Sequence, residues 1–543
     1  MSFRDIDIIC EFLKKKIEYN NTNKIENNEE NLNKIFFQAI QMVVIEGLYL
    51  NESLSPELLI NLKEYILNKF RIKNSDKEKL VLIDNEKYFG VNDFILNKKP
   101  ISNININMQI EFDELNNNNN NNNNDNNTHE FIFDTETLKH NILKIIRGMF
   151  IKKPILIEGS PGIGKTTIVQ NLAKKLNKKI HRVNLSEHTD MIDLIGSQFP
   201  TNDTNIKFKW IDGVLLTAMK HGDWIIIDEM NLANQSILEG LNSILDEKQS
   251  LFIPELNEEI KAHPEFQIFA TQNPVNQGGG RKFLPKNFLN RFIKIYLDEL
   301  NIKDYTEILE KIFIKDNTNN LIDNNIIKNL VEFNEEVKNE IIRNKISLSE
   351  VGEFNLRTMI KFLNTYKLNK YDLIVICNTF YLSRIRHFDI KKILLNKFIQ
   401  IFYAKENNIN INIYLNNTNN YSEEIKLCVE NNYPIIISGE GAIGKKHLIK
   451  STFLNNAKNN LNSFYLYSTM DSSELLGNFD KSNINYQLKQ YIAEIKVKNE
   501  KNDEKNIVNI IDKIEKQKIF LIQKSEVNNN EYNFEWHDSI LIN

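Results

Sequence analysis

The residues with the clearest chemical potential lie in one segment, which begins at Pro154 and reads PILIEGSPGIGKTTIVQNLAKKL. It contains the pattern GxxxxGK[ST] between an apolar run and a helical pattern, which is the context of a phosphate-binding loop. Glycines let successive backbone N–H groups surround phosphates, and the helix N-terminus adds partial positive charge. We expect Lys165 to reach the β- and γ-phosphates of a nucleotide and Thr166 to ligate Mg²⁺. The predicted nucleotide contacts are Gly159, Ser160, Pro161, Gly162, Ile163, Gly164, Lys165, Thr166 and Thr167.

An acidic pair ends a second apolar run. This run reads WIIID from Trp224 to Asp228, and Glu229 follows it directly. Open α/β sheets bind ligands at the carboxyl ends of their strands, so a buried strand here would deliver both carboxylates to the phosphates. We expect Asp228 to hold hydrated Mg²⁺ and Glu229 to polarise the attacking water as general base. The alternative is an ordinary exposed strand end, which the preceding phosphate loop disfavours.

Two further polar residues follow predicted elements downstream. Asn273 ends a strand-like run before a proline, where its amide could orient water against the γ-phosphate; an Asn turn is the alternative. Arg291 ends the helical segment PKNFLNR, where a cation could complete a neighbouring subunit's site as an arginine finger. A solvated surface arginine is the alternative for that position.

These side chains need elements that bring them to one place. From about residue 130 to 300, short β-branched runs alternate with helical patterns, which indicates a parallel sheet covered by helices. The predicted strands are Pro154–Glu158, His181–Leu185, Trp224–Asp228, Phe266–Thr271 and Lys294–Tyr296. Apolar residues at three- and four-residue spacing predict helices at Ile6–Ile17, Asn33–Leu48 and Pro56–Phe70, and again from 303 to about 405.

The order GSPGIGKT, IIIDE, ATQNP and FLNRF resembles that of an AAA+ ATPase. The sequence around these motifs, from about residue 154 to 297, is most similar to the midasin family, whose members carry six AAA+ modules in one chain. The resemblance also places Arg357, in EFNLRTMIKFL, at the sensor-2 position of a lid helix, acting in cis or in trans. The other roles that it implies are Walker A for 159–166, Walker B for Asp228 and Glu229, sensor 1 for Asn273 and arginine finger for Arg291.

From about residue 421 the predicted strand–loop–helix pattern resumes, with a second phosphate loop in the sequence PIIISGEGAIGKK. Its predicted nucleotide contacts are Gly439, Gly444 and Lys445. Lys446 stands where the first loop has Thr166, and a second cation there would oppose a nearby metal. We therefore hypothesise that this second site binds nucleotide weakly or without hydrolysis.

Similarity between the two loops continues downstream, which indicates tandem duplication. The motif DMIDLIG, which ends at Gly196, matches DSSELLG, which ends at Gly477, and FKWIDGVL from Phe208 matches FEWHDSIL from Phe534. The interval between the motifs is longer in the second copy and rich in Lys, Asn and Glu, as an insertion in a surface loop would be. No second acidic pair follows before the sequence ends.

The amino-terminal helices are predicted to be the lid of a preceding module, because Phe3–Leu13 resembles Asn355–Leu363 and places Arg4 near a sensor-2 position. The expected fold class is α/β: an AAA+ P-loop module of a parallel sheet flanked by helices with a helical lid, preceded by another lid and followed by a partial second core. The predicted domains are the preceding lid (1–98), an Asn-rich linker (99–130), the large α/β subdomain (131–300), its helical lid (301–405), a second Asn-rich linker (406–420) and a partial, degenerate second core (421–543).

Composition sets limits on partners and compartment. The chain has 543 residues, 41% of them hydrophobic, so it can form cores; its net charge of −4 does not favour bulk binding to nucleic acid or anionic membranes. The candidate pore hairpin Ser250–Ala262 is acidic, so no direct grip on nucleic acid is predicted. No apolar run is long enough for a bilayer, no secretion signal is recognisable, and three separated cysteines fit a reducing compartment.

The resemblance implies a mechanochemical ATPase that uses ATP and Mg²⁺ to remove assembly factors from pre-60S ribosomal particles in the nucleus, with neighbouring AAA+ modules of the same chain as partners. Three alternatives stay open. A MoxR-type chaperone would be one module in a homohexamer, which the tandem repeat disfavours. A translocase of the minichromosome-maintenance kind would need basic pore hairpins, and a nucleotide-stabilised scaffold would bind ATP without turnover.

By the same resemblance, the sequence corresponds to the third of six modules, with the second module's lid before it and the fourth module's core after it. In a ring, Arg291 would face the preceding module's site, and an arginine beyond Asn543 would complete the site of this module. We therefore expect the sequence to be part of a longer machine and its ATPase activity in isolation to be weak.

Overall fold

The computed structural model describes two units of the chain. The first comprises residues 1–195 and 213–457, and the second comprises 196–212 and 458–543. The described residues are 3–22, 29–45, 80–99, 134–200, 208–274, 281–314, 322–346, 351–368, 370–403 and 421–453, the strands 477–481 and 534–538, and a few residues between 61 and 68. Both predicted Asn-rich linkers and most of the predicted helix Pro56–Phe70 lie outside these ranges.

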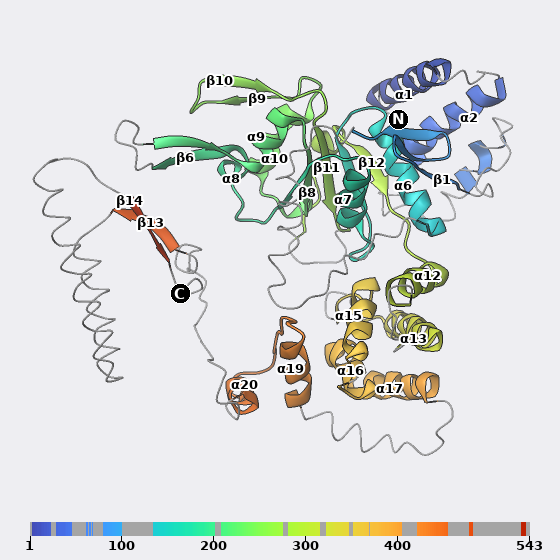
Figure 1. The fold of residues 1–543 in the computed structure, drawn as a ribbon, viewed down its shortest axis with the longest axis vertical. Helices are drawn as coiled ribbons and strands as arrows, with labels where there is room; N and C mark the ends of the chain where they lie inside the picture. The colour runs from blue at the N-terminus through green and yellow to red at the C-terminus, as the bar shows by residue number, and fades with distance from the viewer. Residues whose placement is uncertain are drawn as a thin grey trace, which may run out of the picture. The chain divides into compact units, whose positions relative to one another are not determined.

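A five-stranded parallel sheet forms the centre of the first unit (Figure 1). Its strand order is β12-β4-β11-β8-β5, and the central strands are isoleucine-rich and buried on both faces, as parallel sheets require. All five predicted strands are confirmed to within about a residue at each end. Their bounds are β4 (Ile155–Glu158), β5 (Ile180–Asn184), β8 (Trp224–Asp228), β11 (Gln267–Gln272) and β12 (Ile293–Tyr296).

Helices cover both faces of this sheet. Helix α7 contacts β8 and β11, α6 contacts β4 and β12, and α9 contacts β5 and β8. A hairpin of β9 and β10 realises the predicted acidic hairpin. The bounds are α6 (Glu136–Met149), α7 (Lys165–Lys175), α8 (Met191–Ile195), α9 (Val214–His221), η4 (Met230–Leu232), α10 (Gln235–Leu245), α11 (Lys286–Leu289), β9 (Ser250–Ile253) and β10 (Glu258–Lys261).

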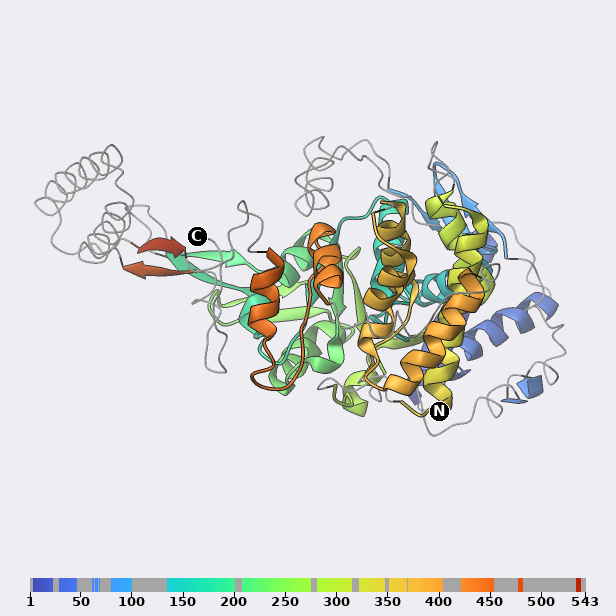
Figure 2. The ribbon, with the colours of Figure 1, turned by 90° about the horizontal axis from the view of Figure 1, so that it is seen from below.

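The predicted lid is a separate group of helices, which lie side by side in both ribbon views (Figures 1 and 2). Its core is aromatic: the rings of Phe333, Phe354 and Phe362 surround the fully buried Tyr381, whose hydroxyl donates a hydrogen bond to Asn334. The bounds are α12 (Ile302–Phe313), α13 (Asn324–Arg343), α15 (Leu356–Lys367), α16 (Leu373–Phe380), η6 (Leu382–Arg384) and α17 (Phe388–Phe402).

The amino-terminal block is helical only in part, so the prediction of a purely helical lid over residues 1–98 is wrong for its last segment. Helices α1 (Phe3–Thr22) and α2 (Glu29–Ile40), the latter extended by the π-turn η1 (Gln41–Ile45), are followed by an antiparallel sheet of β1 (Leu82–Asp84), β2 (Tyr88–Val91) and β3 (Phe94–Asn97). Alternating apolar residues bury Phe89 and Phe94, and Asn92 turns the hairpin with a φ of 51°. The alternation of apolar residues and the turn at Asn92 therefore favour a hairpin over a helix in this segment.

The second phosphate-loop region also departs from prediction. Residues 434–438 form no strand, and Ile436 is 94% exposed, because no neighbouring strand among the described residues offers a hydrogen-bonding edge. Helices α19 (Tyr421–Glu430) and α20 (Lys445–Phe453) flank the loop, and α19 contacts the lid helix α16.

The second unit contains two hairpins that match the internal repeat. Strands β6 (Gly196–Pro200) and β7 (Phe208–Asp212) pair with Gly196 opposite Asp212. Strands β13 (Gly477–Lys481) and β14 (Phe534–Asp538) pair in the same register, with Gly477 opposite Asp538. The extra residues of the second copy therefore lie between two paired strands.

Helix α6 is fastened to the end of β12 by one buried amide. Asn141 is fully buried; its Nδ2 donates to the carbonyl oxygen of Asp298 at 3.0 Å, and its Oδ1 accepts from the Asp298 N–H at 2.9 Å. We predict that Asn141→Ala lowers the free energy of unfolding by roughly 2–4 kcal/mol, because two buried backbone groups lose their partner. Chemical denaturation measures this effect. Asn171→Ala, which removes an exposed amide bonded to Thr167, is the control and should cost less than about 1 kcal/mol.

Candidate nucleotide-binding site

The first phosphate loop connects β4 to α7, and its glycines let other groups approach the loop backbone closely. Gly162 and Gly164 have φ angles of 77° and 90°, which L side chains rarely adopt. A Cβ on Gly162 would lie 2.2 Å from Nδ2 of Asn355, which comes from the lid and donates to the carbonyl oxygen of Pro161 at 3.3 Å. The loop is therefore closed on one side by the lid, and this contact requires glycine at position 162.

Lys165 is folded into the loop. Its Nζ lies 2.7 Å from the carbonyl oxygen of Gly159 and 2.6 Å from Oδ1 of Asn273. Burial lowers the pKa of Lys165 to about 8, although the carboxylates of Glu229, Glu353 and nearby acids oppose this shift. The side chain therefore lies inside the phosphate loop, and its contact with the phosphates of a nucleotide stays a prediction.

Asp228 lies at the carboxyl end of β8 and is almost completely buried. Its Oδ1 accepts hydrogen bonds from Thr166 Oγ1 at 2.8 Å and Thr271 Oγ1 at 2.7 Å, and its Oδ2 accepts one from Nε of Arg182 at 2.6 Å. The structure thus brings together the two predicted Mg²⁺ ligands. Arg182 and Thr271 are additional partners that the sequence motifs did not identify.

The Thr166–Asp228 pair fits a magnesium ion. Mg²⁺ prefers oxygen ligands and is usually held by one or two protein groups together with substrate phosphates. Among the described residues, no three His, Cys, Asp or Glu side chains are grouped as a metal site of their own. A hydroxyl and a carboxylate beside the phosphate loop are therefore the donor set expected for a metal that arrives with the nucleotide.

Glu229 and Asn273 meet at the ends of neighbouring strands. Asn273 Nδ2 donates to Glu229 Oε1 at 2.5 Å, and the Asn273 carbonyl oxygen accepts from Asn231 Nδ2 at 2.8 Å. Glu229 has a left-handed φ of 55°, a strained conformation for this residue, and its Oε2 lies 3.5 Å from the guanidinium of Arg281. The predicted base and the predicted sensor amide are therefore held in direct contact.

Arg291 lies apart from these groups. Its guanidinium donates to Asp246 at 2.7 Å and to Asn242 at 2.7 Å, both at the carboxyl end of α10. The structure therefore does not bring Arg291 together with the phosphate loop of its own chain. The action of Arg291 on a neighbouring module stays a prediction.

The sensor-2 candidate Arg357 is exposed in the first turn of α15. Its backbone N–H donates to the side chain of the helix N-cap, Asn355, which is the residue that contacts the phosphate loop. Arg357 is thus two residues from the loop contact, and no described contact joins its guanidinium to the predicted nucleotide residues. Its role remains a prediction.

Two glutamates near the loop were not predicted from the sequence. Burial raises the pKa of Glu353 to about 7, despite the attraction of Lys165, and Glu299 accepts a hydrogen bond from Ser160 Oγ. Neither residue belongs to a motif with fixed spacing. Only the packing of the lid and of the segment after β12 places them beside Ser160 and Lys165.

The second phosphate loop has the same internal geometry as the first. Lys445 Nζ lies 2.7 Å from the carbonyl oxygen of Gly439 and 2.6 Å from that of Glu440, and Gly444 has a φ of 85°. All of these contacts are exposed, whereas those of Lys165 are largely buried. Among the described residues, no sheet brings acidic partners to this second loop.

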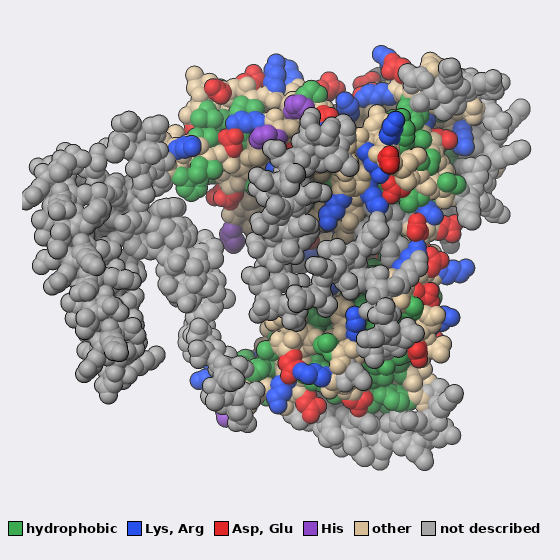
Figure 3. Space-filling model, in the orientation of Figure 1, with side chains coloured by type: hydrophobic (Ala, Val, Ile, Leu, Met, Phe, Trp, Pro, Cys, Tyr) green, Lys and Arg blue, Asp and Glu red, His purple; other side chains and the backbone are tan. Residues whose placement is uncertain are grey.

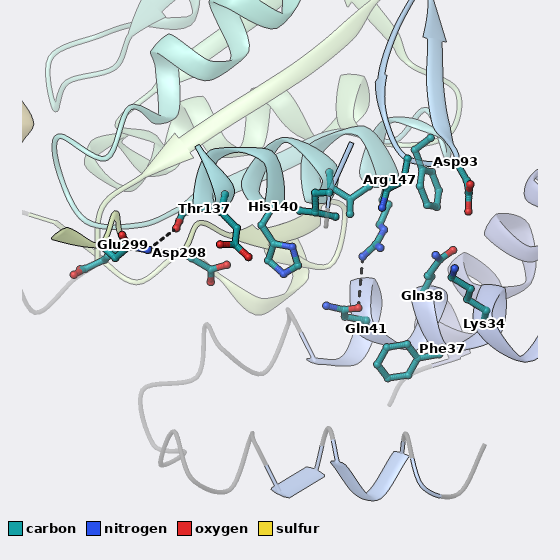
Figure 4. Close-up of a pocket in the computed structure, with 16 residues that line it drawn as sticks. Lys34, Phe37, Gln38, Gln41, Asp93, Thr137, His140, Arg147, Asp298 and Glu299 are labelled. Carbon is teal, nitrogen blue, oxygen red and sulfur yellow. Dashed lines mark hydrogen bonds between the residues drawn. The ribbon is translucent and has the colours of Figure 1, made fainter. Parts of the chain in front are cut away.

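A cavity of about 370 Å³ lies beside α6, between that helix, α2 and the β2–β3 hairpin. Figure 4 shows Arg147 directed toward Gln41, with His140 and Thr137 farther along the same helix. Glu299 also lines it, but none of the described residues 159–167 does. This cavity is therefore distinct from the phosphate loop, although both contact Glu299.

Comparisons with known proteins agree with this geometry. Residues 154–292 match the family model described as an AAA domain of the dynein-related subfamily. The chain is 32% identical over 432 residues to midasin of Dictyostelium discoideum and 48% identical over 183 residues to midasin of Giardia intestinalis. It is also 34% identical over 203 residues to an uncharacterised protein of Staphylococcus epidermidis.

Coverage differs among these relatives. The matches cover 67% and 34% of this chain but only 7% and 4% of the two midasins. The bacterial match covers 36% of this chain and 73% of that protein. The matched family model spans the sheet, the phosphate loop, Asp228, Glu229 and Asn273. The chain therefore carries a domain of the dynein-related AAA type over residues 154–292, and its sequence is midasin-like.

Proposed function

We propose that this chain binds ATP with Mg²⁺ and hydrolyses it at the site between β4, β8 and β11. The observation that carries the proposal is the linked set Lys165–Asn273–Glu229, in which a phosphate-binding cation, a sensor amide and a general base are connected by hydrogen bonds of 2.6 and 2.5 Å. Glu229 and Asn273 directly follow the ends of β8 and β11, and Lys165 begins α7 after the loop that follows β4.

Each residue has a defined role in this proposal. Lys165 contacts the β- and γ-phosphates, and Thr166 and Asp228 hold Mg²⁺, which neutralises charge developing on the phosphates. Glu229 orients the attacking water and accepts its proton, and Asn273 fixes the position of the Glu229 carboxylate. Arg291, which is engaged with α10, would act on a neighbouring module.

We further propose that the chain acts within a midasin-like machine in the nucleus that removes assembly factors from pre-60S ribosomal particles, next to other AAA+ modules of the same chain. Sequence identity to two midasins supports this role. In the view of Figure 3, basic and acidic side chains are interspersed over the described surface, and the described helices include none long and apolar enough to cross a membrane. Co-sedimentation of the tagged protein with pre-60S particles tests the proposal; free sedimentation would contradict it.

The first prediction separates binding from turnover. Glu229→Gln should retain ATP affinity within about threefold but lower turnover by at least roughly 100-fold, because the amide cannot accept the proton. Wild-type turnover should itself be slow, since an arginine finger contributes about 10³–10⁵ and Arg291 is not at this site. Filter binding and phosphate release measure the two quantities. Glu239→Gln, an exposed change on α10, is the control, and equal turnover in the two variants would reject the assignment.

The second prediction concerns pH. Burial keeps the pKa of Lys165 at about 8 in the empty site, and bound phosphates would raise it. Binding above pH 8 therefore requires uptake of a proton by Lys165. The contribution of Lys165 to ATP affinity should be constant below pH 8, and the affinity should fall by up to about tenfold per pH unit above it. Fluorescence titration from pH 7 to 9.5 measures the profile. Lys165→Arg should lack this decline, and parallel profiles would contradict the attribution to Lys165.

The third prediction concerns the second loop. Lys446→Thr should increase nucleotide affinity only when Mg²⁺ is present, because it supplies a metal-binding hydroxyl and removes a competing cation. The measurement is best made with Lys165→Ala in the same chain, which silences the first site. An increase that is equal in EDTA would show that the charge change, not metal ligation, is responsible.

A further inference from the structure

Arg182 is the described side chain that brings a positive charge into direct contact with the buried carboxylate of Asp228. It lies on β5, the edge strand beside β8, and the parallel register places Arg182 opposite Ile226 and Asn184 opposite Asp228. Paired residues share a face of the sheet, so the long arginine side chain reaches one repeat along the strand to the end of β8. Its Nε donates to Asp228 Oδ2 at 2.6 Å.

The carboxylate needs such a counter-ion in the empty site. The side chain of Asp228 is 5% exposed, and its other two described partners, Thr166 and Thr271, are uncharged hydroxyls. A buried carboxylate without a compensating charge is strongly unfavourable. Lys165 interacts electrostatically with Asp228, but its Nζ is hydrogen-bonded to Gly159 and Asn273, so the described direct contact of a cation with Asp228 is that of Arg182.

The same carboxylate is the proposed partner of Mg²⁺. A guanidinium and a divalent cation at one carboxylate repel each other, so the ion and Arg182 compete for Asp228. The Arg182 side chain is 56% exposed, which gives the guanidinium a route into water when the ion arrives. Thr166, in contrast, is shared with the metal in the proposed function and need not leave.

We propose that Arg182 is a placeholder counter-ion: it neutralises Asp228 while the site is empty and is displaced when Mg²⁺ binds with the nucleotide. This inference rests on the proposed nucleotide site. In this role, Arg182 sets the Mg²⁺ concentration that the site requires for tight nucleotide binding. A different role, in which Arg182 holds Asp228 in position for the metal, predicts the opposite effect of its removal.

The test measures the Mg²⁺ concentration at half-maximal gain in affinity for a fluorescent ATP analogue, using the full chain and EDTA-buffered solutions. Arg182→Gln should shift this midpoint to a lower Mg²⁺ concentration by roughly three- to tenfold. This is the effect expected when Mg²⁺ no longer has to displace one half-exposed charged hydrogen bond. Affinity in EDTA should change little. Without ligands, Arg182→Gln should unfold at a lower temperature than wild type. Adding Mg²⁺ and nucleotide together should raise the unfolding temperature of the variant more than that of wild type.

Two variants serve as controls. Arg182→Lys keeps a cation and should leave the midpoint near that of wild type. Arg343→Gln removes an exposed arginine from another buried carboxylate, Glu340, which also pairs with Lys397, at the end of the lid helix α13, and should not move the midpoint. An unchanged or higher midpoint in Arg182→Gln would overturn the placeholder role. Absence of any nucleotide binding by wild type would instead reject the proposed function on which it rests.

Discussion

A buried carboxylate at the end of β8 imposes the main requirement on this AAA domain. Asp228 is held between neighbouring strands and the phosphate-loop helix, and each contributes a hydrogen bond to it. The sheet can satisfy such a group only because its strands run parallel and end at the same edge. Strand order, the position of α7 and the hydroxyls of Thr166 and Thr271 all serve this buried position.

The lid meets the core through polar rather than apolar contacts at the phosphate loop. Asn355 caps α15 and at the same time reaches Pro161, so the start of a lid helix and the loop share one amide. Glu353 is held close enough to Lys165 for their charges to interact. A change in charge within the loop therefore changes the electrostatic potential at Glu353 and at the start of α15. This provides a physical route by which occupancy of the site could be communicated to the helices.

Much of the core could be predicted from sequence because its signals are local. The loop glycines, the isoleucine run before Asp228 and the strand before Asn273 each fix a backbone state and a position. Arg182 and Glu353 could not be found in this way, since their importance comes from strand register and lid packing. The antiparallel sheet of β1–β3 was missed because its short alternation was outweighed by the helical periodicity before it. The strand expected at 434–438 does not form for the opposite reason, since this locally suitable run has no neighbouring strand within the part of the chain that the structure describes.

The shared register of β6–β7 and β13–β14 has a consequence for how this architecture can be diversified. The two strands of the second hairpin remain paired although residues 482–533 separate them, against residues 201–207 in the first. The entropic cost of closing a loop grows only logarithmically, so this difference amounts to roughly 2 kcal/mol. The hairpin tip is therefore a tolerant position for new sequence. A binding element or a reporter domain could be introduced there while the pairing of β13 with β14 is preserved.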